Sequence, residues 1–100
     1  MDCVDRHARR LEELRRAVFE GDGVTDREVR VAAAAGTSVT EPVRGYAAKV
    51  CEASYRVTDE DIEGLKTDGM DEEAVFEITV AAALGAALHR FEAGLRAVSE

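Results

Sequence analysis

Apolar residues recur along this chain with the period of a helix. In residues 3–20 they are separated by three or four positions, which places them on one side of a helix. The members of this stripe are Val4, Ala8, Leu11, Leu14 and Val18. The sequence EGDG at residues 20–23 ends this predicted helix. No stretch alternates apolar and polar residues in the way of a half-buried strand, so the pattern predicts an all-α protein.

Helix-capping residues predict where the next two helices begin. Thr25, followed three positions later by Glu28, matches a capping box and opens a short helix. Gly36 is the expected end of that helix, because glycine adopts the left-handed conformation that closes helices. Thr40, followed by Pro42, supplies a capping hydroxyl and an early-turn proline for a third helix that runs to about residue 56.

Capping residues also predict where two further helices begin. Thr58 precedes three acidic residues, which the positive end of a helix dipole favours, and this fourth helix stops at Asp68-Gly69. Asp71 opens the last helix, which is roughly 40 Å long if it continues to residue 98. The prediction is therefore a single helical domain over residues 1–100, with about five helices and a long C-terminal helix.

The centre of the last helix carries no charge on any face over residues 78–88. A helix of this kind must be covered all round, and four short helices can hardly do so. Gly85 lies among Ala81, Ala82 and Ala86, and a glycine inside a helix costs about 1 kcal/mol relative to alanine. We therefore expect Gly85 at a close helix–helix contact between subunits, and no stable monomer. An ordinary buried helix of a monomer is the alternative.

Composition and charge narrow the class of protein. Apolar residues make up 46% of the chain, but 17 of them are alanine and only 23 are Leu, Ile, Val or Phe. This is enough for one domain and thin for a monomer. The net charge is −8, and residues 51–100 hold four basic and twelve acidic groups. Such a charge repels a phosphate backbone, so we expect no nucleic-acid partner.

Several features point to a protein of the cytoplasm. The opening residues MDCVD lack a basic segment followed by an apolar one, so no secretory signal is expected. The longest nearly apolar run, residues 78–88, has eleven residues, against roughly 20 for a membrane span. Cys3 and Cys51 lie far apart and form no C-x-x-C pair. We expect reduced thiols, no membrane partner, no metal and no cofactor.

Residues from about 25 to 98 carry a resemblance to a known family. The segments that carry it are Tyr46-Ala47-Ala48-Lys49-Val50, Val57-Thr58-Asp59-Glu60-Asp61-Ile62, Gly69-Met70-Asp71-Glu72-Glu73-Ala74-Val75-Phe76-Glu77, Ala81-Ala82-Ala83-Leu84-Gly85 and His89-Arg90. Together they resemble the closing half of the carboxymuconolactone decarboxylase and alkyl hydroperoxidase D-like family. The resemblance implies an all-helical fold that assembles as a homo-oligomer, often a trimer or hexamer.

The chain departs from this family at its reactive cysteines. Peroxidase members use a C-x-x-C pair, because one thiolate attacks and a second thiol resolves the intermediate. Cys51 has no such partner, and Cys3 lies outside the matching region. The leading interpretation is a homo-oligomer without thiol peroxidase activity, in a binding or accessory role. The alternative is a cofactor-free, decarboxylase-like enzyme that acts on a small acidic or lactone substrate in a pocket between subunits.

Glu77 and His89 are candidate catalytic residues. Glu77 follows Phe76 just before the apolar run, and partial burial would raise its pKa toward the range of a general base. A solvated or salt-bridged acid is the alternative. His89 comes twelve residues later, about 18 Å along the same helix. The two side chains can meet only across an antiparallel contact between two copies; otherwise His89 has a capping or pairing role.

Cys51 is the third candidate. It shares a helical face with Tyr55, and Tyr46 lies close to that face, which predicts either a pocket with a reactive thiol or a packed, inert cysteine. Cys3 and His7 are four residues apart and make only half of a metal site. The arginines of the first helix suit an anion or an acidic partner, but interleaved glutamates favour a solvated face.

Overall fold

The structure is a computed structural model that describes residues 2–36 and 41–99, with side chains described from Arg6 onward. Over these residues it is helical and contains no strand. Its elements are α1 (Asp2–Phe19), α2 (Arg27–Ala35), α3 (Val43–Ala53), the 3-10 turn η1 (Ser54–Arg56), α4 (Asp59–Thr67) and α5 (Glu72–Ser99). The predicted all-α class, with five helices and a long C-terminal helix, is confirmed.

Several predicted helix ends are confirmed by their local hydrogen bonds. The Thr58 hydroxyl accepts from the Asp61 amide at 3.3 Å, and the Asp61 carboxylate accepts from the Thr58 amide at 2.9 Å. This reciprocal pair is a capping box that begins α4. Gly36 ends α2 in the left-handed region at φ 69°. Asp71 precedes α5, and its carboxylate accepts from the Ala74 amide at 2.8 Å.

The predicted start of the second helix is wrong. The N-cap of α2 is Asp26 rather than Thr25, and Asp26 makes no side-chain capping bond. The Thr25 hydroxyl lies 2.6 Å from a carboxylate oxygen of Glu77, which is 52 positions away in the sequence. This long-range bond outcompetes the local cap. Thr40, the predicted start of the third helix, lies outside the described residues, and Pro42 is the N-cap of α3.

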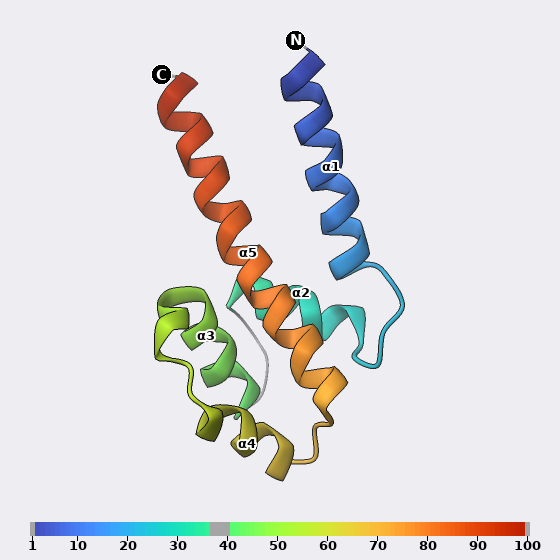
Figure 1. The fold of residues 1–100 in the computed structure, drawn as a ribbon, viewed down its shortest axis with the longest axis vertical. Helices are drawn as coiled ribbons and strands as arrows, with labels where there is room; N and C mark the ends of the chain where they lie inside the picture. Colours follow the sequence, from blue (N-terminus) through green and yellow to red (C-terminus); the bar gives the residue numbers. More distant parts are fainter. Residues whose placement is uncertain (1, 37–40, 100) are drawn as a thin grey trace.

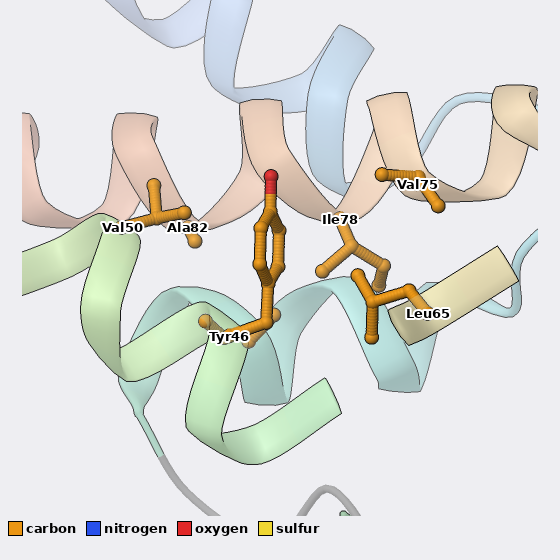
Figure 2. Close-up of a cluster of buried hydrophobic side chains, with 8 residues drawn as sticks. Tyr46, Val50, Leu65, Val75, Ile78 and Ala82 are labelled. Carbon is orange, nitrogen blue, oxygen red and sulfur yellow. The ribbon is translucent and has the colours of Figure 1, made fainter. Parts of the chain in front are cut away.

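The core lies where α2, α3 and α4 pack around the N-terminal half of α5 (Figure 1). Its buried members are Ala33, Tyr46, Ala47, Val50, Leu65, Val75, Ile78 and Ala82. The Tyr46 ring lies between Val50 and Ile78 in Figure 2, and its hydroxyl reaches Thr79 Oγ1 at 2.6 Å. The Thr79 hydroxyl in turn donates to the Val75 carbonyl at 2.7 Å, so Tyr46 donates to Thr79. The polar end of the buried tyrosine is thereby satisfied.

Gly85 lies at a close helix–helix contact, as predicted, but the neighbour is α2 of the same chain. A Cβ atom on Gly85 would lie 2.5 Å from the Ala34 carbonyl oxygen and 2.6 Å from the Ala34 Cβ. The expectation that another subunit makes this contact is therefore wrong. The C-terminal half of α2 consists of alanines, whose side chains are small enough to let the backbones of α2 and α5 approach each other. Ala81 and Ala82 are buried on this side of α5, whereas Ala83 and Ala87 are exposed.

Two helical segments extend beyond this core and give the molecule an elongated shape. We call them the arms: residues 6–19 of α1 and residues 88–99 of α5. Both chain ends lie at the same end of the molecule (Figure 1). The extents are 49 × 27 × 22 Å and the radius of gyration is 14.8 Å, against about 13 Å for a compact chain of 100 residues. The accessible surface is 7026 Å², whereas a monomer of this mass exposes about 5,500 Å².

Among the described helices, α5 is long and apolar enough to cross a bilayer by length and composition alone. This is a weak indication, because the core helix of a globular protein meets the same criterion. The buried residues of α5 are Val75, Ile78, Ala81 and Ala82, all in its N-terminal half, which packs inside the protein. The absence of a membrane partner stays a prediction.

Candidate functional site

Glu77 binds the loop between α1 and α2. Its carboxylate accepts from the Val24 amide at 2.9 Å, from the Thr25 amide at 2.9 Å and from the Thr25 hydroxyl at 2.6 Å. Partial burial raises the pKa of Glu77, but the bonds from Thr25 and Val24 and the positive charge of Arg30 outweigh it and lower the pKa below its ordinary value. The expected rise in the pKa of Glu77 is therefore not found, and its carboxylate is an ionised acceptor that holds a loop.

Arg30 holds the same loop from the other side. It is buried, with 4% of its surface exposed, and its guanidinium donates to the carbonyls of Val18 and Gly21, each at 2.7 Å. Its Nε atom has no hydrogen-bond partner among the described residues. Arg30 and Glu77 together fix the turn from α1 into α2, which we call the corner (residues 20–25). Arg30 is not among the residues predicted from the sequence, although a single charge in the apolar run VRVAAAA is a signal for a buried, hydrogen-bonded side chain.

Cys51 is a packed thiol. Its Sγ donates to the Ala82 carbonyl at 3.3 Å, with Ala33 O at 3.9 Å. Burial raises the pKa of Cys51, the nearby Glu52 carboxylate raises it further, and Arg90 opposes both. A thiol with a raised pKa is protonated at neutral pH and is a poor nucleophile. The structure thus favours the inert interpretation of Cys51.

The predicted grouping of Cys51 with two tyrosines is wrong. Tyr55 lies in η1, where the helical spacing is broken, and 85% of its surface is exposed. Tyr46 is buried in the core and bonds Thr79. Neither ring lines the surface around Cys51, so the spacing within α3 does not build a pocket.

Cys51 and His89 instead line one open hollow between α2, α3 and α5, of about 620 Å³. Its wall is mostly small side chains, with four polar or reactive groups: Cys51, Glu52, His89 and Arg90. The Arg90 guanidinium donates to the Cys51 carbonyl at 2.9 Å, which ties α5 to α3 here. Glu77 does not line this hollow. Within one chain, then, His89 lines a hollow together with Cys51 and not with Glu77.

A second hollow separates the two arms. This cleft has a volume of about 450 Å³ and is largely apolar. Its lining residues are His7, Ala8, Leu11, Glu12, Arg15, Leu88, Phe91, Glu92 and Leu95. Phe91 and Leu95 keep 48% and 51% of their surface exposed, and Leu14 keeps 48%. An apolar surface of this kind, rimmed by charged groups, is typical of an interaction site.

Two of the candidate arginines on α1 form ion pairs within their own helix. Arg15 and Arg16 pair with Glu12 of the same helix, at 3.0 Å and 3.3 Å. The described residues contain no group of three His, Cys, Asp or Glu side chains that could hold a metal ion. The predicted pairing of Cys3 with His7 lies outside the residues whose side chains are described.

Comparison of the chain with models of protein families, with curated proteins and with solved structures gave no match.

Proposed function

We propose that this chain is a self-associating helical protein of the alkyl hydroperoxidase D-like type, without thiol peroxidase chemistry, that serves as a binding or accessory subunit. The observation that carries the proposal is the apolar cleft between the arms, with Phe91 and Leu95 half exposed. Arms that leave such side chains in water are stabilised when a partner covers them.

The exposed area supports association of copies. The chain exposes 7026 Å², which is about 1,500 Å² more than a compact monomer of the same mass. A stable interface needs about 800 Å² from each partner. Light scattering coupled to size exclusion should give a multiple of 10.8 kDa at micromolar concentration, with a trimer or hexamer as the proposed assembly. A mass of one chain would contradict self-association.

The state of Cys51 supports the absence of peroxidase chemistry. Its raised pKa and its bond to the Ala82 carbonyl keep the sulfur protonated and directed into the protein. Incubation with an organic hydroperoxide and a dithiol reductant should give no turnover above the rate without protein. Turnover that disappears in Cys51→Ser would show that the thiol is reactive after all.

A second candidate function is binding and conversion of a small acidic or lactone substrate without a cofactor. One observation favours it: His89 and Arg90 line the hollow beside Cys51, and both can bind a carboxylate. Titration with succinate and with a γ-lactone carboxylate, followed by the NMR signals of His89, tests the candidate. Binding that is abolished in Arg90→Met would support this second function. A His89 signal that stays unchanged on titration would contradict it.

A further inference from the structure

A stripe of large apolar side chains runs along α5 and through the cleft between the arms. Its members follow one another at alternating steps of four and three residues: Leu84, Leu88, Phe91, Leu95 and Val98. This spacing is the seven-residue repeat with which one helix packs against another. From Leu88, the first member that lines the cleft, to Val98 the stripe extends roughly 15 Å, or about three helical turns.

The rest of the chain covers only part of this stripe. Leu84 and Leu88 are partly buried. Phe91 keeps 48% of its surface exposed, Leu95 keeps 51% and Val98 keeps 85%. Exposure therefore increases along the arm of α5, which runs antiparallel to α1 (Figure 1). An apolar groove between two helices is a surface in which the apolar face of a third helix can lie.

The extent of the apolar surface favours a helix over a small molecule as the occupant. The cleft alone, at about 450 Å³, has the size of a small-molecule site. The apolar surface continues beyond it, because Val98 on α5 and the half-exposed Leu14 on α1 do not line the cleft. A small molecule in the cleft would leave these side chains in water, whereas a helix that follows the stripe would cover Val98 as well.

The charges that line the cleft favour a basic occupant. Most arginines of the arms do not line it; the charged side chains that do are Glu12, Arg15 and Glu92, with His7 uncharged at neutral pH. Arg15 pairs with Glu12 at 3.0 Å, and Glu92 forms no ion pair with any described side chain. The lining is therefore net negative, and the chain as a whole has a charge of −8. A cationic partner is attracted to such a surface, whereas a second copy of the same cleft is repelled.

We infer that the cleft between the arms binds a basic amphipathic helix of a partner protein. The apolar side chains of that helix pack against Phe91 and Leu95, and its lysines or arginines lie beside Glu92. This inference rests on the binding role in the proposed function and names the chemistry of the partner. It does not depend on the association of copies.

A synthetic peptide is the probe for this site. It consists of leucine and lysine over about four turns, with its leucines three and four residues apart. Fluorescence anisotropy of the labelled peptide should show saturable binding to the native chain. A peptide of the same composition, with its leucines spread over all faces of the helix, should bind at least about tenfold more weakly. Equal affinity for the two peptides, or no binding of the first, would overturn the inference.

Two variants that add the same charge locate the peptide on the chain. Leu95→Glu places a carboxylate in the cleft and should weaken binding about tenfold or more. Tyr55→Glu, at an exposed position that lines none of the hollows described above, is the control and should keep the native affinity. Nonspecific attraction to a chain of charge −8 would instead be tightened by Leu95→Glu, and this result would overturn the inference. Circular dichroism checks the fold, and Leu95→Ser replaces Leu95→Glu if helicity falls.

A second pair of variants tests the charge at the cleft. Glu92→Gln should weaken binding of the leucine–lysine peptide about two- to fivefold, since it removes an exposed ion pair with the peptide. Glu28→Gln removes the same charge from an exposed position on α2, outside the cleft, and should have a smaller effect. Equal losses in the two variants would mean that net charge alone attracts the peptide, and would overturn the placement of its basic residues beside Glu92.

Light scattering separates this inference from the proposed self-association. A native chain that is a monomer and binds the peptide contradicts self-association and supports the inference. An oligomer that Leu95→Glu converts to single chains would show that copies cover the cleft, and would overturn the inference. An oligomer that keeps its mass in Leu95→Glu supports it, because the cleft is then free for a partner. Flotation of the native chain with phosphatidylglycerol vesicles, lost in Leu95→Glu, would show that lipid covers the cleft and would also overturn the inference.

Discussion

Two glycines of α5 differ in what surrounds them. A Cβ atom on Gly85 would lie 2.5 Å from the Ala34 carbonyl oxygen, whereas one on Gly94 would meet nothing within 4 Å. Both positions are in the same helix, so both substitutions gain the same helix propensity. The difference in stability between the two variants therefore measures the contact between α2 and α5.

Gly85→Ala should destabilise the protein and Gly94→Ala should stabilise it. Alanine is favoured over glycine in a helix by about 1 kcal/mol, and this gain is unopposed at Gly94. At Gly85 the added methyl group forces α2 away, and overpacking of this kind costs about 1–3 kcal/mol. Urea unfolding of the two variants measures both effects. Gly85→Leu, with its larger side chain, should lower the free energy of unfolding more than Gly85→Ala does. A Gly85→Ala variant as stable as Gly94→Ala would contradict the prediction, since it would mean that α2 and α5 separate at little cost.

Glu77 makes the stability of the protein depend on acid. Because its pKa is lower in the folded state than in the unfolded chain, the folded state favours the ionised form. The stabilisation is complete above the unfolded pKa, which is about 4.3 for a glutamate, and is lost as the pH falls through the lower folded pKa. Glu77→Gln should lower the free energy of unfolding at pH 7 by about 1–3 kcal/mol, since bonds to a charged acceptor are lost.

The pH dependence distinguishes this charge effect from a change of shape. The stability difference between the native chain and Glu77→Gln should shrink as the pH is lowered from 7 to 3. Glu13→Gln, an exposed carboxylate on α1, serves as the control and should change stability little at either pH. A difference that stays constant with pH would indicate that Glu77 acts by packing alone.

At the scale of elements, Arg30 determines how α1 is attached. It joins the end of α1 to α2 through the carbonyls of Val18 and Gly21. In Arg30→Met these two carbonyls lose their donors, so the backbone amides of α1 should exchange with deuterium faster, while those of α3 stay protected. Arg27→Met is the matched control, since Arg27 is an exposed arginine on the same helix whose contact to Asp22 is at 4.0 Å. Equal exchange in both variants would mean that the α1–α5 contact holds α1 by itself.

The helices could be predicted from the sequence because their signals are local. Thr58 and Asp61 are three residues apart, and Gly36 and Gly69 act through their own backbone angles. The corner could not be predicted in this way. Thr25 looks like a cap from its neighbours, and only the packing of α5 brings Glu77 to it.

The grouping of the candidate site residues could not be predicted from the sequence either, because it also depends on packing. Glu77, His89 and Cys51 were selected by residue type and by the apolar run beside them. Which of them share a surface depends on how α3 packs against α5, and this packing places Cys51 and His89 along one hollow that Glu77 does not line. Gly85 was identified correctly as a close contact, but its neighbour was not, because a stripe of small residues does not specify which helix approaches it.

At the scale of the whole molecule, the net charge of −8 predicts how the proposed association responds to salt. The Debye length falls from about 10 Å at 0.1 M salt to about 3 Å at 1 M. Copies of like net charge repel one another, and salt screens this repulsion, so association should tighten as sodium chloride is raised from 0.05 to 0.5 M. Sedimentation at several salt concentrations measures this. Dissociation as salt is raised would indicate that oppositely charged surfaces hold the copies together.

The polar attachment of α1 has a consequence for the order of folding. Phe19 is the only described residue of α1 that is buried, and the core cluster comes entirely from residues 33–82. Helices α2 to α5 can therefore form that cluster before α1 docks, and docking α1 on the far half of α5 requires the closure of a much longer loop. Leu11→Ala should then speed unfolding and leave the refolding rate nearly unchanged, whereas Ile78→Ala should slow refolding, as stopped-flow kinetics can measure. The cleft between the arms is therefore completed last, after the core is already closed, so that a partner that fits the cleft meets only a folded chain.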